Sequence, residues 1–141
     1  MLLDEPRATI GLNEVALGIV APTWFSGPLE RAVGSRVTES MLQLATLLPP
    51  ARALSLGLVD ELAPRGHVLG AAVEAAARYG AMHPTARHSS KLLMRHNLIA
   101  STIGTPAQRS ADLAMTWKYF SSSEVQAGLK MYLERLAKRG R

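Results

Sequence analysis

Residues 49–62, PPARALSLGLVDEL, combine the signals of a short helix with those of a strand. Pro50 can open the helix, because the first turn of a helix does not need a backbone amide proton, and Gly57 suits the residue just past its end. The apolar pair Leu58-Val59 then predicts a brief strand. A helix followed at once by a strand favours an α/β fold.

The segment before this element predicts further short strands. Thr9-Ile10 is typical of the last residues of one strand, and residues 15–20 form a second apolar stretch or a turn that leads into Ala21-Pro22. Two or three short strands that lie far apart in the sequence cannot form a stable sheet by themselves, and parallel strands need helices on both faces. We therefore expect the chain to be the second half of a larger α/β domain.

Helices are predicted for most of the remaining chain. Before residue 49, one helix ends near Gly34 and another follows the spacing of Val37 and Met41 as far as Leu48. The landmarks of four later helices are the alanine-rich stripe from Val68 to Tyr79, the start after His83-Pro84, the spacing of Leu113, Trp117 and Phe120, and the apolar face of Val125, Leu129, Tyr132, Leu133 and Leu136. Ser121 and Glu124 have the spacing of a capping box for the last of these helices.

The composition limits the class of protein. With 141 residues, 48% of them hydrophobic and 19% charged, the chain is long enough for one core and too apolar for a disordered protein. Its apolar runs are far shorter than the roughly 20 residues that cross a bilayer, so no membrane span is expected. The first residues, MLLDEP, have the features of neither a signal peptide nor a transit peptide.

The net charge of +5 suits a nucleic acid, an anionic membrane surface or a phosphorylated small molecule. Aromatic residues are only 5% of the chain, and no helix-turn-helix signature or zinc finger is present, so a nucleic-acid partner is not expected. The chain contains no cysteine, which excludes a disulfide, a thiolate ligand and a cysteine nucleophile. The four histidines include no HExxH motif and no pair three or four residues apart on one helix face, so no metal site is expected.

One acid stands in an apolar setting. In IGLNEVALGIVAP, residues 10–22, Glu14 follows Asn13 and has leucine, valine and isoleucine neighbours. Apolar surroundings disfavour the charged form of a carboxyl group and make its carboxylate a more competent base. The alternative is a carboxylate at a turn or strand end that points to water, and periodicity alone leaves both interpretations open.

Glu14 also lies within a motif that resembles a known family. The matching runs are IGLNE at 10–14 and LGI at 17–19, followed by Ala21-Pro22 and Trp24. They resemble the segment that bears the catalytic glutamate in the mitochondrial 3,2-trans-enoyl-CoA isomerases of the crotonase superfamily. The resemblance continues through PPARALSLGLVDEL, SKLLMR at 90–95 and LKMYLERLAKR at 129–139, so it covers essentially the entire chain. The ALxLGLVD element marks only the superfamily, whereas GLNE and MYLERL specify the isomerases.

This resemblance implies the C-terminal half of a crotonase-like fold, mostly helical with two or three short strands. Residues 1–62 would be the end of the spiral core with the catalytic glutamate. Residues 63–141 would be a C-terminal helical region for trimerisation and CoA contact. In the family the oxyanion-hole amides come from segments that precede this one, so the chain alone is expected to be weakly active or inactive.

The implied reaction is the isomerisation of 3-cis- or 3-trans-enoyl-CoA to 2-trans-enoyl-CoA in β-oxidation of unsaturated fatty acids. Glu14 would move a proton from the α to the γ carbon, and Asn13 would help to shape the substrate pocket. No cofactor is implied, because the substrate is itself a coenzyme A thioester, and its adenine end would meet a basic residue such as Lys91, Lys118 or Lys130. The resemblance further implies a homotrimer in the mitochondrial matrix.

Two alternatives remain. Enoyl-CoA hydratases carry a comparable glutamate, but a Gly-Ala-Gly-Gly-Thr-like turn usually follows it where this chain has APTWF at 21–25. Hydration also needs a second glutamate, which in hydratases lies upstream. Outside the enzymes, the alternative is a catalytically silent helical module that associates with full-length isomerase subunits through its amphipathic last helices.

Overall fold

The computed structural model describes residues 2–139, so Met1, Gly140 and Arg141 of the two predicted regions lie outside it. The elements in chain order are β1 (Leu2–Leu3), the 3-10 helix η1 (Glu14–Leu17), α1 (Thr23–Val33), α2 (Ser35–Gln43), α3 (Pro50–Ser55), β2 (Leu62–Ala63), α4 (Val68–Gly80), α5 (Pro84–Thr102), α6 (Pro106–Phe120) and α7 (Ser123–Arg139). Along this part of the chain, no helix combines the length and the apolarity that a membrane crossing requires.

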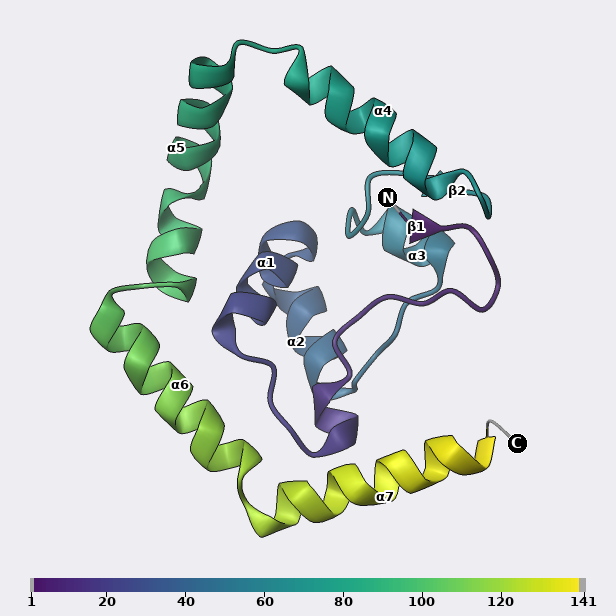
Figure 1. Ribbon diagram of the computed structural model, residues 1–141, viewed down its shortest axis with the longest axis vertical. Coiled ribbons are helices and arrows are strands. Elements are labelled where there is room, and N and C mark those ends of the chain that lie inside the picture. Colours follow the sequence, from purple (N-terminus) through teal and green to yellow (C-terminus); the bar gives the residue numbers. More distant parts are fainter. Residues whose placement is uncertain (1, 140–141) are drawn as a thin grey trace.

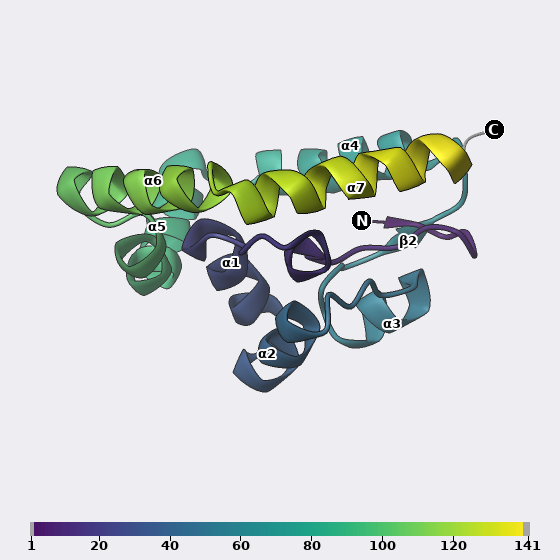
Figure 2. The ribbon, with the colours of Figure 1, turned by 90° about the horizontal axis from the view of Figure 1, so that it is seen from below.

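The elements form two regions of different character. The core region, residues 2–63, contains β1, η1, α1, α2, α3 and β2, and the outer helices are α4 to α7. Figure 1 shows the outer helices as an open arc around α1, α2 and α3. Seen from the side in Figure 2, α4, α6 and α7 lie at a similar level, and α2 and α3 project away from them. The chain thus changes near residue 63 from a packed region to an arc of helices, and the roles predicted for residues 1–62 and 63–141 stay predictions.

The core region encloses one small hydrophobic core. Its five buried side chains come from three helices and the loops beside them: Leu29, Met41, Leu48, Ala53 and Val59. Half-buried apolar side chains, including Leu12 and Leu42, pack around this cluster. Burial of apolar surface stabilises this region by roughly 25 cal/mol for each Å² removed from water. The loop residues that precede η1 are thereby fixed against α2.

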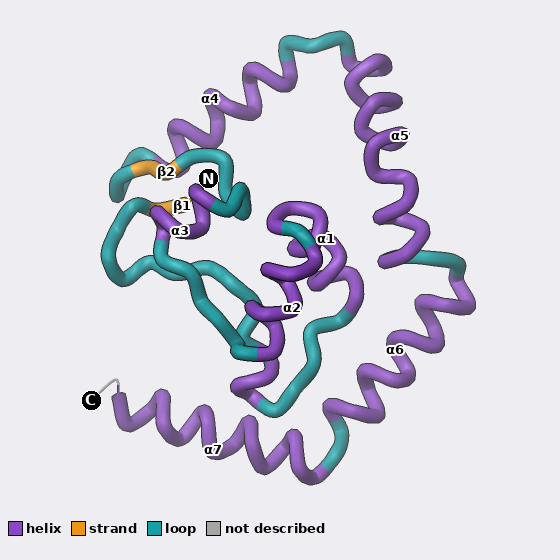
Figure 3. The backbone as a smooth tube through the Cα atoms, turned by 180° about the vertical axis from the view of Figure 1, so that it is seen from behind, coloured by secondary structure: helices purple, strands orange, loops and turns teal. Residues whose placement is uncertain are grey.

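The two strands are short and parallel. Leu2 pairs with Leu62 and Leu3 with Ala63, and the amide of Asp4 donates a 2.8 Å hydrogen bond to the Ala63 carbonyl. Most of the chain between β1 and α1 is loop (Figure 3). The prediction of a strand that ends at Thr9-Ile10 is wrong, because Ile10 forms only an isolated antiparallel bridge to Leu48.

The predicted strand at Leu58-Val59 is also wrong. The amides of both residues donate to the Ala53 carbonyl, at 2.9 and 3.4 Å, and so they close the end of α3. Val59 is buried in the core, and the strand begins only at Leu62. Leu58 beside Val59 is half-buried, and the backbone of the pair is bent rather than extended.

Two helix ends differ from the predictions for local reasons. The helix expected to reach Leu48 ends at Gln43, because Ala45 has a φ of 50° and the Thr46 amide turns back to the Met41 carbonyl at 2.9 Å. The predicted capping box of Ser121 and Glu124 is wrong. Ser121 is the C-cap of α6, and the amide of Val125 instead donates to the Ser122 hydroxyl at 3.4 Å. A capping box is found at the start of α6, between Thr105 and Gln108.

The predicted apolar faces of the outer helices are only partly covered. Among the residues after Ala63 whose burial is described, Val125 alone is buried, with 4% of its surface exposed. On the alanine stripe of α4, which contacts β2, Ala71, Ala72 and Ala75 are half-buried, but Tyr79 is 67% exposed. The outer helices therefore leave most of their apolar side chains exposed.

Candidate functional site

Glu14 stands directly after a segment that the core region holds in place. The Ile10 amide donates to the Leu48 carbonyl at 3.0 Å, and the Leu48 amide donates back at 2.8 Å. A Cβ on Gly11 would lie 2.5 Å from the Thr46 carbonyl oxygen, so the backbone can approach this closely only because residue 11 is glycine. These contacts fix the chain three residues before the acid.

The 3-10 helix η1 begins at Glu14 and is closed by a glycine. Gly18 has a φ of 75°, a left-handed conformation that favours glycine, and its amide donates to the carbonyls of Glu14 and Val15. The Ile19 amide also donates to the Glu14 carbonyl, at 3.0 Å, and the Ile19 side chain is buried. The segment predicted as an apolar stretch or a turn is therefore a single tight helical turn with one buried anchor.

The Glu14 carboxylate borders a small apolar cavity. The cavity has a volume of about 70 Å³ and is lined by Leu12, Glu14, Val15, Val20, Ala21 and Leu42. Oε2 of Glu14 is buried and has no hydrogen-bond partner in the protein. Native proteins usually pair buried polar atoms, and a catalytic role is one explanation for an exception. An unpaired carboxylate oxygen beside an apolar cavity can accept a proton from a bound ligand.

Asn13 is next to Glu14 but is placed differently. It is the N-cap residue of η1 and is half-buried, and its side chain makes no capping hydrogen bond. Its carbonyl accepts a 3.1 Å hydrogen bond from the Ala16 amide. Asn13 is not among the six residues that line the Glu14 cavity, so its contact with substrate stays a prediction.

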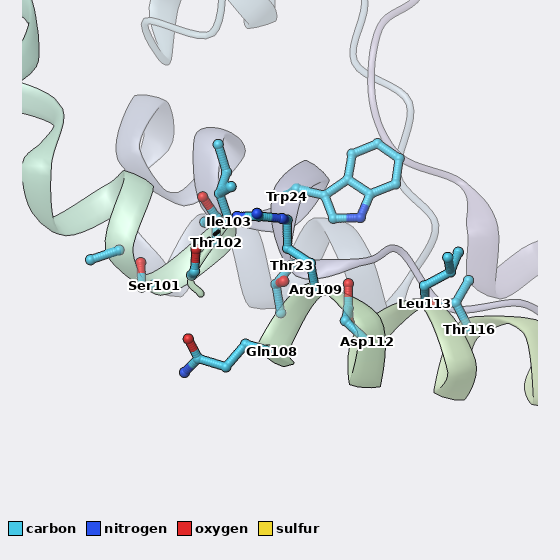
Figure 4. Close-up of a pocket in the computed structure, with 12 residues that line it drawn as sticks. Thr23, Trp24, Ser101, Thr102, Ile103, Gln108, Arg109, Asp112, Leu113 and Thr116 are labelled. Carbon is cyan, nitrogen blue, oxygen red and sulfur yellow. Dashed lines mark hydrogen bonds between the residues drawn. The ribbon is translucent and has the colours of Figure 1, made fainter. Parts of the chain in front are cut away.

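A larger cavity of about 290 Å³ lies beside the start of α1. It is lined by Thr23 and Trp24 of α1, by the end of α5 and the loop after it, and by polar and apolar residues of α6. Figure 4 shows Trp24 together with Arg109, Asp112 and Leu113 around this cavity. The Arg109 guanidinium donates a 2.9 Å hydrogen bond to the Gly104 carbonyl, which ties α6 to the loop before it. Sequence patterns gave no signal for this cavity, because its residues come together only through the packing of three helices.

The remaining predicted site residues are dispersed. Lys91, Lys118 and Lys130 lie on α5, α6 and α7, one on each helix, and all three are exposed. In the part of the chain that the structure describes, no three histidine, aspartate or glutamate side chains gather in a way that could hold a metal ion. The chemistry of the described site is therefore that of one carboxylate in an apolar setting.

Known proteins match the sequence of this chain over nearly its whole length. A family model described as enoyl-CoA hydratase/isomerase matches residues 2–139. The mitochondrial enoyl-CoA delta isomerase 1 of Homo sapiens is 43% identical over 96% of this chain and 44% of its own length. The protein of the same name from Mus musculus is 39% identical over 96% of this chain and 46% of its own length. The chain thus spans about half the length of the curated relatives that it matches.

Solved structures have the same fold over this region. The crystal structure of human mitochondrial delta3-delta2-enoyl-CoA isomerase superposes with a TM-score of 0.88 and 40% identity, over 98% of this chain and 52% of that one. An enoyl-CoA hydratase/isomerase from Pseudoalteromonas atlantica superposes with a TM-score of 0.77 over 96% of this chain and 53% of that one. At 22% identity, the second match supports the fold alone.

Proposed function

Because the chain belongs to the enoyl-CoA hydratase/isomerase family, we propose that Glu14 is the base of an enoyl-CoA isomerase. The substrate is a 3-cis- or 3-trans-enoyl-CoA from unsaturated fatty acids, and the product is the 2-trans-enoyl-CoA. One observation carries this proposal: Oε2 of Glu14 is buried and unpaired beside an apolar cavity. Relatives that are 43% and 39% identical are named enoyl-CoA delta isomerases, which supports this choice of reaction.

Glu14 acts twice in the proposed mechanism. Its carboxylate removes a proton from the α carbon beside the thioester, and the electron pair of that C–H bond forms a dienolate with the C3–C4 double bond. The protonated Glu14 then returns the same proton to the γ carbon, and the double bond comes to rest between the α and β carbons. Apolar walls such as Leu12 and Leu42 keep water from competing for that proton.

The lining of the cavity supplies the one acid that isomerisation requires. Glu14 is the single acid among the six described residues around the cavity, and the other five are apolar. Hydration would require a second acid or base to activate a water molecule, whereas moving a proton along the substrate requires only one. The alternative of a hydratase therefore needs a carboxylate that this wall of the site does not supply.

The same lining indicates that this chain alone has weak turnover. The enolate oxygen requires hydrogen-bond donors; none of the six lining side chains carries one, and the resemblance to the isomerases implies that the donating backbone amides lie in segments that precede this one. Loss of one such donor costs about 10²–10³ in rate in a well-studied enzyme. We expect the donors to come from the rest of the family domain, since the relatives are about twice as long as this chain.

The larger cavity provides a place for the acyl chain. Ala21 lines the Glu14 cavity and Thr23 lines the larger one, so their Cα atoms are no more than about 7 Å apart. Trp24 and Leu113 supply apolar surface there. We expect the acyl chain to extend from Glu14 past Pro22 toward Trp24. The exposed Lys91, Lys118 and Lys130 are candidates for contact with the adenine end of CoA.

We further propose that the outer helices join copies of the chain into a homotrimer. Leu93 is 80% exposed and Trp117 is 73% exposed, and exposed apolar surface of this kind is typical of protein interfaces. The relatives named above are mitochondrial, which supports a location in the mitochondrial matrix.

An isomerase assay of the full chain with a 3-enoyl-CoA substrate tests the function. We expect Glu14→Gln to lower kcat by about 10²–10⁴, the usual contribution of one acid-base group. Glu39→Gln, which removes an exposed carboxylate on α2, is the matched control and should leave the rate unchanged. Turnover that survives Glu14→Gln would contradict the assignment. An inactive chain that binds isomerase subunits would favour the alternative of a silent interaction module.

A further inference from the structure

Among the residues of the outer helices whose burial is described, one is buried, and it lies on α7, the outer helix that contacts η1. Val125, near the start of α7, is 4% exposed, and it is the single buried residue among those after Ala63 whose burial is described. The face of α7 that continues from it is half-buried at Gly128, Leu129 and Tyr132. These spacings of three, four and seven residues place the four side-chain positions on one side of the helix. That side of α7 contacts η1.

One glycine of α7 lies close to the end of η1. A Cβ placed on Gly128 would lie 3.6 Å from the carbonyl oxygen of Leu17, the last residue of η1. That distance is ordinary van der Waals contact, so alanine fits at position 128. A side chain that branches at Cβ would place further atoms against the same carbonyl, and its χ1 rotation is restricted within a helix.

We propose that α7 positions the catalytic base: Val125 and Gly128 hold η1 in the place that aims Glu14 at its cavity. η1 is only four residues long, so hydrogen bonds within it fix its internal shape but not its position. Besides the fixed residues before and after it, η1 contacts two helices that can set its position, α2 and α7. The inference rests on the proposed function, and it adds two positioning residues that lie more than 100 positions from Glu14 in the sequence.

Carbodiimide labelling of carboxylates, read by mass spectrometry on the full chain, tests this placement without requiring turnover. Oε2 of Glu14 is buried, so labelling at Glu14 should be slow in the unmodified chain. We expect Gly128→Val to increase labelling at Glu14 several-fold and to leave exposed Glu39 unchanged. Gly128→Ala should behave like the unmodified chain. Gly70→Val is the matched control, because Gly70 also lies in a helix and a Cβ there would meet no atom within 4 Å.

A second pair of variants tests the role of α7 by removing side-chain atoms instead of adding them. Val125→Ala removes the buried anchor, and Val59→Ala makes the same change at a buried site in the core region. We expect faster labelling of Glu14 in Val125→Ala alone. Unchanged labelling of Glu14 in both Gly128→Val and Val125→Ala overturns the proposal, and so does an equal increase in their controls.

Enzyme kinetics separate this inference from the proposed function. If the chain turns over 3-enoyl-CoA, Gly128→Val should lower kcat by about 10²-fold with little change in KM, as expected when a catalytic group is displaced by about 1 Å. Turnover that survives Glu14→Gln, with the labelling pattern as expected, would count against the isomerase assignment but not against the contact between α7 and η1. A fall in kcat without any change in labelling overturns the positioning role.

Discussion

The core region and the outer helices contain the same kinds of apolar side chain but bury them very differently. In the core region Met41 is 3% exposed and Ala53 is fully buried. In the outer helices Leu93 is 80% exposed and Trp117 is 73% exposed. Both regions show helical spacing of apolar residues in the sequence. The spacing therefore identifies the face of a helix that will be buried, but not what will cover it.

The difference has a consequence for the assembly. A monomeric protein rarely exposes large contiguous apolar patches, and Val125 is the single buried residue among those of the four outer helices whose burial is described. The core region buries apolar side chains through its own contacts, whereas we expect the outer helices to gain most of their stabilisation from a partner. The proposed trimer is one such partner, and the rest of the family domain is another.

The largest expected effect is that of a core truncation. Met41→Ala should lower the free energy of unfolding by about 2–5 kcal/mol, because it removes a buried side chain and leaves a cavity. Leu93→Ala, the matched truncation on α5, should change the free energy of unfolding of the monomer by less than about 0.5 kcal/mol. Urea denaturation of both variants at low protein concentration makes the measurement. Equal losses would show that the outer helices are packed as tightly as the core.

The next effect concerns the joint between the two regions. A Cβ on Gly27 of α1 would overlap the Thr102 side chain of α5 and press on Leu98. Overpacking in Gly27→Ala should therefore lower the free energy of unfolding by about 1–3 kcal/mol. Alanine forms helices better than glycine, which offsets this loss by about 1 kcal/mol or less. Gly70→Ala on α4 meets nothing within 4 Å and should stabilise the chain by about 0.5–1 kcal/mol. Melting temperatures that change in the same direction in both variants would contradict this tight packing of α1 against α5.

Local sequence chemistry predicted the helices well and the strands poorly. Pro50 opens α3 and Gly57 follows its end with a φ of 74°, as predicted from the chemistry of proline and glycine. The helices predicted after residue 66 are all present, and the crotonase-like fold is confirmed by the match to the solved isomerase. The strands predicted at residues 9–10 and 58–59 are wrong, because two-residue strands depend on partners some 60 positions away, as Leu2 and Leu62 show. No local pattern encodes such a pairing.

The candidate site was predictable only in part. The apolar neighbours of Glu14 in sequence, Leu12 and Val15, do line its cavity. Leu42 completes that lining from α2, and Gly128 supports η1 from α7, but neither contact left a signal in the sequence. When the residues around a site are adjacent in sequence, the local composition shows whether the site is apolar. Contacts across the fold depend on how helices pack, and a single sequence does not specify that.

The smallest expected effect concerns an ion pair beside the two strands, between Glu5, which follows β1, and Arg65, which follows β2. The Arg65 guanidinium donates two hydrogen bonds to the Glu5 carboxylate, at 2.5 and 2.6 Å, and these bonds, with the attraction of the opposite charges, lower the pKa of Glu5. A lowered pKa in the folded state stabilises the fold above the pKa of the unfolded chain, and this stabilisation is lost as the pH falls through the folded value.

We therefore expect the free energy of unfolding to decline slightly more in the unmodified chain than in Glu5→Gln between about pH 6 and about pH 3, the range around the usual pKa of a glutamate. The effect should be small, because Arg65 is 78% exposed and water screens the pair. Urea denaturation across this range makes the measurement, and Glu39→Gln controls for loss of a carboxylate elsewhere in the core region. A decline that is the same with and without the Glu5 carboxylate would mean that the two-stranded sheet, and not this ion pair, holds β1 in place. The core region would then depend on apolar burial and backbone pairing alone, which would widen its contrast with the outer helices.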